Sequence, residues 1–272
     1  MEDIQEHIIK DGKGKTKPVF ISRNGKHQYK IKYSKDGDWV KPYYGNAVPS
    51  ATSIIKHLEG DTFGIGMAWA MKLAKESGDP YQARIESNKA VESGNELHDC
   101  IDRFIKSNGS DIAEDNKMFN IWYRDVGSLP ENKFLKGELF VYAPYAEFGG
   151  TIDGVSMNPD TGEIRSYPRS KPVEEPKPYR NEMAEAVEIY GSPIKDHVQL
   201  AGYFLALREM GSIYAPVKAN IVYLMRDGSS SKIVPVDLEF NEGLFAQSFD
   251  LYKTLRVAKN RNSNLNSSLV GA

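Results

Sequence analysis

One aspartate lies inside an apolar segment that has the composition of a buried strand. The segment reads Gly150-Thr151-Ile152-Asp153-Gly154-Val155. A carboxylate in a buried strand is costly unless hydrogen bonds or a metal ion offset the loss of water around it. Asp153 is therefore a candidate metal ligand, and the alternative is an aspartate near a turn whose side chain points to solvent.

Three other polar side chains have helical spacing. His98 follows Gly94-Asn95-Glu96-Leu97 in a segment of helical periodicity, although a single helical histidine is more often a packed or surface residue than a ligand. Gln199 and Tyr203 are four residues apart in a later helical segment, so their side chains share one face. Taken alone, this pair is also typical of an ordinary helix surface.

The elements that must position these residues alternate between helices and strands. Helical periodicity from Gly64 to Ile105, with expected breaks near 78–80 and 93–94, is followed by a predicted helix at 111–127. The later predicted elements are strands at 137–142, 149–155 and 163–167, a Pro-rich loop at 168–181, helices at 182–190 and 194–210, strands at 219–225 and 232–236, and a helix at 242–260. This order predicts a mixed α/β fold in which a central sheet is flanked by helices.

We expect one domain over residues 19–261. Residues 1–18 are rich in Lys and Gly and are predicted to be a flexible basic N-terminus. Residues 19–47 alternate with period two around a turn-forming Lys35-Asp36-Gly37-Asp38 and predict a β-hairpin extension. The Asn- and Ser-rich residues 262–272 are predicted to be a disordered tail.

Basic residues are concentrated near the start of the chain. The whole chain has 35 Lys and Arg against 37 Asp and Glu, yet residues 10–41 hold ten basic and three acidic residues with Tyr and Trp between them. This pattern is typical of a polyanion-binding surface or of a solvated hairpin, and Lys30 and Lys32 are its candidate DNA contacts. Lys253 and Arg256 form a second candidate ridge on the last helix, where a solvated helix face is the alternative.

Composition excludes several classes of protein. The single cysteine, Cys100, can form neither an internal disulfide nor an iron–sulfur cluster held by four cysteines. No apolar run approaches the roughly 18 residues of a membrane span, and the acidic, polar first residues do not have the pattern of a targeting segment. We therefore expect a cytoplasmic protein with no membrane partner.

Taken in order, the motifs resemble one nuclease family. The set comprises Val48-Pro49-Ser50-x-Thr52, Trp69, Gly94-x-x-x-His98, Glu138, Gly150-Thr151-Ile152-Asp153 and Gln199-Leu200-Ala201-x-Tyr203. It is similar to PD-(D/E)xK nucleases of the RecB/Cas4 branch, most of all to the mitochondrial genome maintenance exonuclease group and its phage and bacterial relatives. The resemblance covers about residues 45–260. It implies a restriction-endonuclease-like core, Mg²⁺ or Mn²⁺, and hydrolysis of DNA from single-stranded or frayed ends.

The resemblance also implies roles for single residues. Asp153 matches the first metal-binding aspartate, His98 the helical histidine near the metal, and Glu138 an acidic residue found before the aspartate strand in several relatives. Gln199 and Tyr203 match the helix motif that supports the site and the DNA backbone. The implied partner is DNA, preferentially single-stranded, together with replication or recombination proteins in a bacterial or phage-infected cytoplasm.

The third strand departs from the family pattern of Asp/Glu-x-Lys. In the register that we prefer, Tyr167 stands in the place of the acid and Arg169 in the place of the lysine; a shift of one residue gives Pro168 and Ser170. Neither register supplies a carboxylate. Arginine stays protonated, so Arg169 can contact a phosphate but cannot act as a base.

Two other acidic residues are conceivable replacements for the missing ligand. Glu163 lies four residues before Tyr167, about 13 Å away along a strand, and Glu175-Pro176-Lys177 has the right composition in a Pro-rich loop. The sequence therefore leaves two hypotheses open: a divalent-metal-dependent DNA exonuclease, and a catalytically degenerate relative that binds DNA ends or replication and recombination partners without cleavage. A fortuitous similarity is the third, and it predicts no salt-sensitive binding to DNA.

Overall fold

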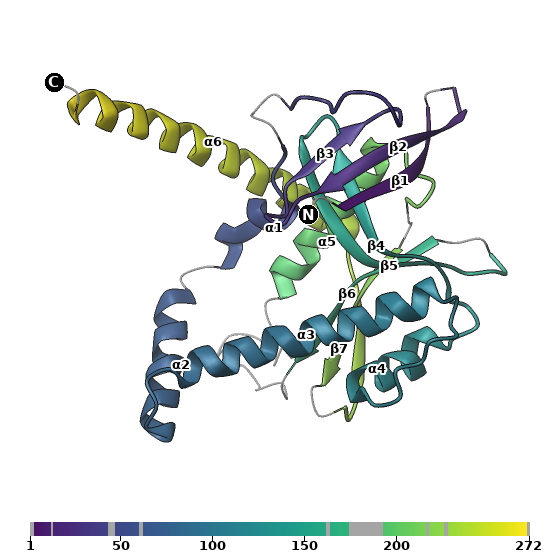
Figure 1. Ribbon diagram of the computed structural model, residues 1–272, viewed down its shortest axis with the longest axis horizontal. Coiled ribbons are helices and arrows are strands. Elements are labelled where there is room, and N and C mark those ends of the chain that lie inside the picture. Colours follow the sequence, from purple (N-terminus) through teal and green to yellow (C-terminus); the bar gives the residue numbers. More distant parts are fainter. Residues whose placement is uncertain are drawn as a thin grey trace.

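The computed structural model describes residues 3–11, 13–42, 47–59, 62–161, 164–173, 193–215, 218–225 and 228–270. Within them the chain forms a mixed α/β fold with two sheets (Figure 1). The first is an antiparallel sheet of β1 (Asp3–Lys10), β2 (Thr16–Arg23) and β3 (Tyr29–Lys32). The second contains, in spatial order, β4 (Lys133–Ala143), β5 (Phe148–Met157), β6 (Ile164–Val173), β7 (Lys218–Met225) and β8 (Ser231–Pro235).

Helices precede, interrupt and follow the second sheet. They are α1 (Ala51–Ile54), the 3₁₀ segment η1 (Ile55–Glu59), α2 (Thr62–Ser77), α3 (Gln82–Lys106), α4 (Lys117–Trp122), the π-helical turn η2 (Tyr123–Gly127), α5 (Pro193–Glu209) and α6 (Leu238–Val270). The pair β6 and β7 is parallel, whereas the other neighbours are antiparallel. Because parallel strands need a crossover connection, α5 lies between β6 and β7 in the chain.

Helices cover the five-stranded sheet on both faces at β7. Ile221 and Tyr223 pack with Leu200 and Phe204 of α5, whereas Val222 and Leu224 belong to the cluster of α3, α4 and η2. Successive residues of a strand point to opposite faces. The nearly continuous apolar sequence of β7 is therefore that of a strand buried on both sides.

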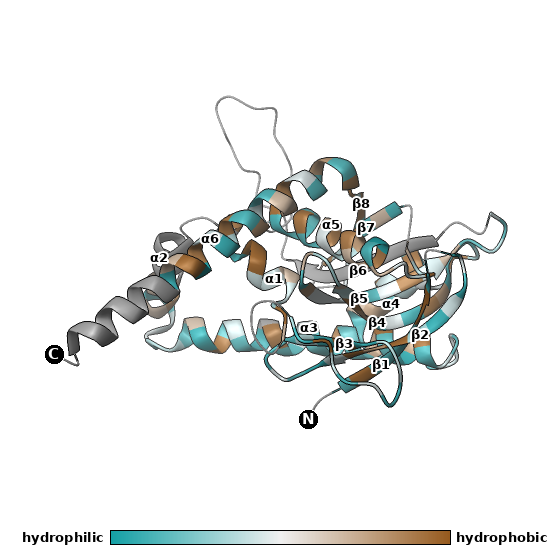
Figure 2. Ribbon diagram, turned by 90° about the horizontal axis from the view of Figure 1, so that it is seen from above, coloured by the Kyte–Doolittle hydropathy of each residue, from teal (hydrophilic) through white to brown (hydrophobic). Residues whose placement is uncertain are grey.

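The N-terminal sheet covers the remaining part of the second face. Phe140 and Tyr142 of β4 pack with buried side chains of that sheet, including Ile21 and Ile31. Leu139 and Val141 of the same strand belong instead to the core formed with α5 and α6. Figure 2 shows α5 and α6 along one side of the five-stranded sheet and the N-terminal sheet on the other.

The N-terminal segment differs from the sequence-based expectation. Residues 3–10 form β1, and β2 begins at Thr16, so the prediction of a flexible segment up to residue 18 is wrong there. His7 and Ile9 are buried on one face of β1. The reversal between β2 and β3 falls at residues 24–28 instead of at Lys35-Asp36-Gly37-Asp38, and the predicted hairpin is part of a three-stranded sheet.

Three helices also differ from the prediction. The helix α3 is continuous from Gln82 to Lys106, so the predicted break near 93–94 is wrong. The predicted helix at 111–127 is shorter, because α4 begins at Lys117 after the N-cap Asn116. The helix α6 continues to Val270, through most of the predicted disordered tail, and extends away from the sheets (Figure 1).

The remaining expectations are met to different extents. Strands near 137–142, 149–155, 219–225 and 232–236 and a helix near 194–210 are confirmed. The strand β6 extends to Val173, into the predicted loop. The predicted helix at 182–190, Glu163 and Glu175-Pro176-Lys177 lie outside the described residues. Among the helices that the structure describes, none is long and apolar enough to cross a membrane.

Candidate functional site

A cleft of about 530 Å³ lies where the N-terminal sheet, α1, η1, β4, β5 and α5 meet. Three of the candidate site residues line it: Glu138, Asp153 and Tyr203. The other lining residues are Arg23, Lys26, His27, Tyr29, Ser50, Thr52, Ser53, Lys56, Thr151 and Lys195. The cleft therefore joins two acidic side chains to four Lys and Arg side chains.

The five-stranded sheet splits next to Asp153. The pairing of β5 with β6 covers Val155–Met157 of β5 and ends at Val155 opposite Ser166. Beyond that point β6 continues alongside β7 as far as Val173, whereas Gly149 of β5 forms a parallel bridge with Ser50. Asp153 thus lies just beyond the last β5–β6 pair, where β5 remains paired with β4 on its other side.

The β6 segment at this split is irregular. The pairing with β7 shifts between Ser166 and Arg169, so Tyr167 and Pro168 occupy a bulge. Proline has no N–H for a ladder hydrogen bond and is tolerated at such bulges. The backbone therefore places Tyr167-Pro168 just beyond the last β5–β6 pair, in the part of β6 nearest to Asp153 along the strand, and Arg169 opposite Ile221. The side chains of residues 164–173 lie outside the described part of the structure.

His98 of α3 contacts Asp153. Its Nε2 atom is 3.4 Å from Oδ2 of the aspartate. The side chain of Asp153 is 18% exposed and that of His98 34% exposed, so both groups remain accessible from solvent. A Cβ on Gly137 of β4 would lie 2.7 Å from Oδ1 of Asp102, and this glycine therefore permits the close approach of α3 that brings His98 to β5.

Glu138 lies across the strand pair from Asp153. The register joins Gly137 to Gly154 and Leu139 to Ile152, with Glu138 and Asp153 between these two pairs. Glu138 has a φ of 46°, in the left-handed region that is unfavourable for a residue with a Cβ. Its local backbone is held by Gln5, which donates to the Glu138 carbonyl at 2.6 Å and accepts from the Phe140 N–H at 2.9 Å.

Arg23 neutralises Glu138 from the N-terminal sheet. Its Nη1 atom is 3.5 Å from Oε2 of Glu138 and also donates to Oγ1 of Thr151 at 3.4 Å. The guanidinium lies 4.7 Å from the centre of the Phe140 ring, which fixes its plane. The N-terminal sheet therefore supplies a cation to the cleft, and the sequence pattern did not single out this residue.

Gln199 and Tyr203 form one unit on α5. The Gln199 amide donates to Oγ1 of Thr52 at 2.9 Å and to the Tyr203 hydroxyl. A Cβ on Gly150 would lie 2.1 Å from the Tyr203 ring. The glycine before Thr151 is therefore required for the ring to lie against β5, where Tyr203 is part of the cleft lining.

A second tyrosine contacts β5 through the neighbouring glycine. A Cβ on Gly149 would lie 2.4 Å from the ring of Tyr29, whose hydroxyl is 3.0 Å from Oγ1 of Thr151. Burial, and next the nearby Tyr203, raise the pKa of Tyr29. The Tyr29 hydroxyl therefore stays protonated at neutral pH.

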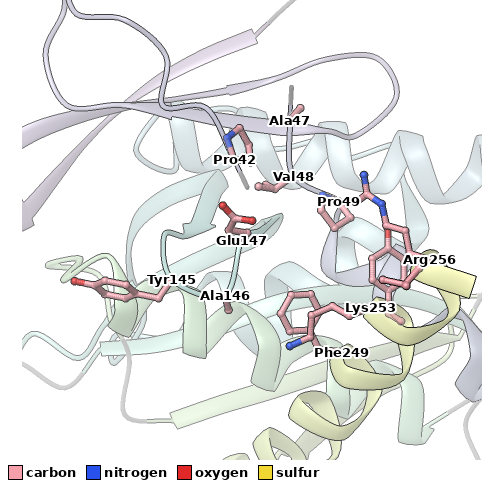
Figure 3. Close-up of a pocket in the computed structure, with 12 residues that line it drawn as sticks. Pro42, Ala47, Val48, Pro49, Tyr145, Ala146, Glu147, Phe249, Lys253 and Arg256 are labelled. Carbon is pink, nitrogen blue, oxygen red and sulfur yellow. The ribbon is translucent and has the colours of Figure 1, made fainter. Parts of the chain in front are cut away.

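Four predicted DNA contacts lie outside the cleft lining. Lys30 and Lys32 are on β3, and the Lys32 ammonium donates to the Lys35 carbonyl and lies 5.1 Å from the centre of the Trp39 ring. Lys253 and Arg256 line a separate groove beside α6 (Figure 3). Lys26 of the cleft belongs to the basic stretch 10–41, although it was not named as a DNA contact. Lys56 and Lys195 were missed because they lie beside the motifs of Thr52 and Gln199 without being part of them.

The described residues supply part of a divalent-cation site. Asp153 and His98 bring an oxygen and a nitrogen donor into contact, and Glu138 is turned to Arg23. Among the side chains that the structure describes, no group of three or more His, Cys, Asp or Glu gathers as a metal site. Carboxylate oxygen is the preferred ligand of Mg²⁺, and imidazole suits later transition metals, so this pair of donors favours Mn²⁺ over Mg²⁺.

Comparison with protein-family models and with curated proteins finds no match to this chain.

Proposed function

We propose that this chain is a divalent-metal-dependent DNA exonuclease with a restriction-endonuclease-like core, which hydrolyses phosphodiesters at single-stranded or frayed DNA ends. The observation that carries the proposal is the cleft at the split of the sheet, where Asp153 contacts His98 and lies across from Glu138. The order of the motifs along the chain and the mixed sheet with helices on both faces agree with this class of enzyme.

Each group of the cleft has a role in this proposal. Asp153 and His98 hold the metal ion, which, when bound, activates water and stabilises negative charge on the phosphate. Arg23 holds Glu138 and compensates its charge. Tyr203, fixed by Gln199 and Thr52, donates its hydroxyl to the DNA backbone. Lys26, Lys56 and Lys195 attract the phosphates from the rim, and Arg169 contacts a phosphate from β6.

The test is digestion of 5′- or 3′-labelled single-stranded DNA by the full chain with Mn²⁺. Replacing Asp153 with Ala removes the carboxylate donor, so we expect cleavage to fall by at least about 100-fold, with DNA affinity in EDTA unchanged within about threefold. Asp115→Ala, at an exposed position between α3 and α4, is the matched control. Equal cleavage by the Asp153→Ala variant and the unmodified chain would overturn the proposal.

The second candidate function is binding of DNA ends, or of replication and recombination partners, without cleavage. It is favoured by the Tyr167-Pro168 bulge of β6 at the position of the expected second acid. In this case the unmodified chain binds labelled single-stranded DNA in Mn²⁺ and leaves it intact. The double variant Tyr167→Asp with Arg169→Lys restores the acid and the lysine, so cleavage that appears only in this variant would establish the second function.

A further inference from the structure

A second concave surface lies on the other side of residues 48–50 from the cleft. It is a groove of about 500 Å³ lined by residues 47–49, by the turn between β4 and β5, and by α6 (Figure 3). Val48 pairs with Tyr29, and the Pro49 carbonyl accepts from the Gly149 N–H at 2.9 Å. Val48 and Pro49 line the groove, whereas the next residue, Ser50, lines the cleft. The segment of residues 48–50 therefore borders both surfaces.

The groove combines aromatic rings with cations. Tyr145, Phe249 and Tyr252 line it, and Tyr145 is 86% exposed. Lys253 also lines it, with its ammonium 4.6 Å from the centre of the Phe249 ring, and so does Arg256 (Figure 3). Glu147 is the acidic residue in the lining, so with Lys253 and Arg256 the lining residues carry a net charge of +1; the Lys253 ammonium also pairs with Asp250 at 2.7 Å.

The same combination continues onto the N-terminal sheet. Burial, and next Tyr145, raise the pKa of Tyr33 on this sheet. The Lys17 ammonium lies 5.4 Å from the centre of the Tyr33 ring, and that of Lys32 lies 5.1 Å from the Trp39 ring. Alternating rings and cations bind single-stranded nucleic acids, because bases stack on the rings while phosphates are held by the cations.

We propose that the groove holds nucleotides of a DNA single strand whose end lies in the cleft, with bases stacked on Tyr145 and Tyr252 and phosphates bound by Lys253 and Arg256. This inference rests on the proposed function and adds a path for the strand beyond the site of hydrolysis. A single strand fits this surface better than a duplex, because the bases of a duplex are stacked on each other and cannot reach aromatic side chains. The exposed Tyr145 ring and the positive charge favour it over an apolar peptide.

The binding test uses the full chain in EDTA, so that no cleavage occurs, with a fluorescent oligothymidylate of about 20 nucleotides. The double variant Tyr145→Ala with Arg256→Ala removes one ring and one cation from the groove. We expect its affinity to fall about tenfold or more. The matched control is Tyr81→Ala with Lys259→Ala, which removes an exposed ring on the segment before α3 and an exposed lysine of α6 outside the groove. Equal affinities of the groove and control variants would overturn the proposal.

A second measurement locates the strand directly. An oligonucleotide with one photoreactive 5-iododeoxyuridine, moved stepwise from the end, is cross-linked to the unmodified chain and mapped by mass spectrometry. Cross-links to Tyr145 or Tyr252 at an internal position support the path, and cross-links confined to other segments contradict it. If the cross-links contradict the path, the groove variant is tested for loss of binding to a protein. Loss of that binding with normal DNA affinity would identify a protein partner instead of DNA.

The outcomes separate this inference from the proposed function. A cleft variant, Lys56→Ala with Lys195→Ala, is measured with the same oligonucleotide. Weaker binding by the cleft variant alone would overturn the groove and leave the proposed function standing. Weaker binding by the groove variant alone would support the groove and contradict the role of the cleft. An unmodified chain without DNA affinity would overturn both.

Discussion

At the scale of single residues, opposed carboxylates set the chemistry of the cleft. Like charges across a strand pair are destabilising, and Glu138 and Asp153 occupy such positions. Arg23 lies on Glu138 and His98 on Asp153. Because Arg23 is always protonated, Glu138 keeps a permanent cationic partner. In the proposed function, the Asp153 carboxylate and the His98 imidazole would hold the metal ion.

A buried histidine gives the N-terminal sheet a pH-dependent stability. His7 is 1% exposed, and its ring nitrogens have no hydrogen-bond partner among the described residues. Burial, and next the charge of Lys136, lower its pKa from 6.5 to about 4. Between these values the unfolded chain binds a proton that the folded chain does not bind. This contribution to stability is therefore complete above pH 6.5 and is lost as the pH falls toward 4.

The replacement His7→Leu removes this titration. Between pH 7.5 and pH 4.5 the unmodified chain is expected to lose about 2–3 kcal/mol more of its free energy of unfolding than the variant loses. Urea unfolding followed by circular dichroism at both pH values measures the difference. Parallel losses in the two proteins would show that His7 is not the titrating group.

At the scale of elements, the packing of α5 on β5 depends on one glycine. The Gly150→Ala methyl group would lie 2.1 Å from the Tyr203 ring, which is also held by Gln199. Overpacking of this kind typically costs about 1–3 kcal/mol, so we expect Gly150→Ala to lower the free energy of unfolding by about 3 kcal/mol and to weaken cleavage by displacing Tyr203.

Gly94→Ala on α3 is the control for this variant. An added Cβ there meets nothing within 4 Å, and alanine is favoured over glycine inside a helix by about 0.5–1 kcal/mol. Urea unfolding is therefore expected to shift in opposite directions for the two substitutions. A Gly150→Ala variant as stable as the unmodified chain would contradict the close packing of Tyr203 on β5.

The same elements explain what the sequence could predict. The strands around Asp153 and the helix of Gln199 have clear periodicity and turn residues at their ends, so their existence and the candidate residues on them were predictable. The strand β1 was not, because its buried positions include His7, a polar residue type. The approach of Arg23 to Glu138 joins residues 115 apart, and the split of the sheet is accompanied by the bridge of Gly149 to Ser50, 99 residues away. No local pattern records either contact.

At the scale of the whole molecule, basic side chains gather at the cleft and the groove although the chain as a whole is slightly acidic. The chain has a formal net charge of −2, so a nonspecific field does not attract DNA. The cleft nevertheless carries Arg23, Lys26, Lys56 and Lys195, and the groove carries Lys253 and Arg256. The proposed path across both surfaces would bring a single strand past six basic side chains, and each neutralised phosphate would release bound counterions.

Salt dependence therefore measures the whole path. Because Arg23 is paired with Glu138, five of these side chains are counted as phosphate contacts. With about 0.7 counterions released per contact on a single strand, five contacts predict a slope of about −3.5 for log affinity against log salt, a loss of roughly 130-fold between about 50 and 200 mM. Replacing Lys56 and Lys195 with Ala should reduce the slope to about −2, because two contacts are lost. Fluorescence anisotropy in EDTA at four or more salt concentrations gives the slopes.

The control double variant, Lys72→Ala with Lys89→Ala, removes the same charge from exposed positions of α2 and α3 and should leave the slope unchanged. Equal slopes for the two double variants would mean that the attraction comes from the surface as a whole. A slope near zero for the unmodified chain would contradict phosphate contacts at both the cleft and the groove.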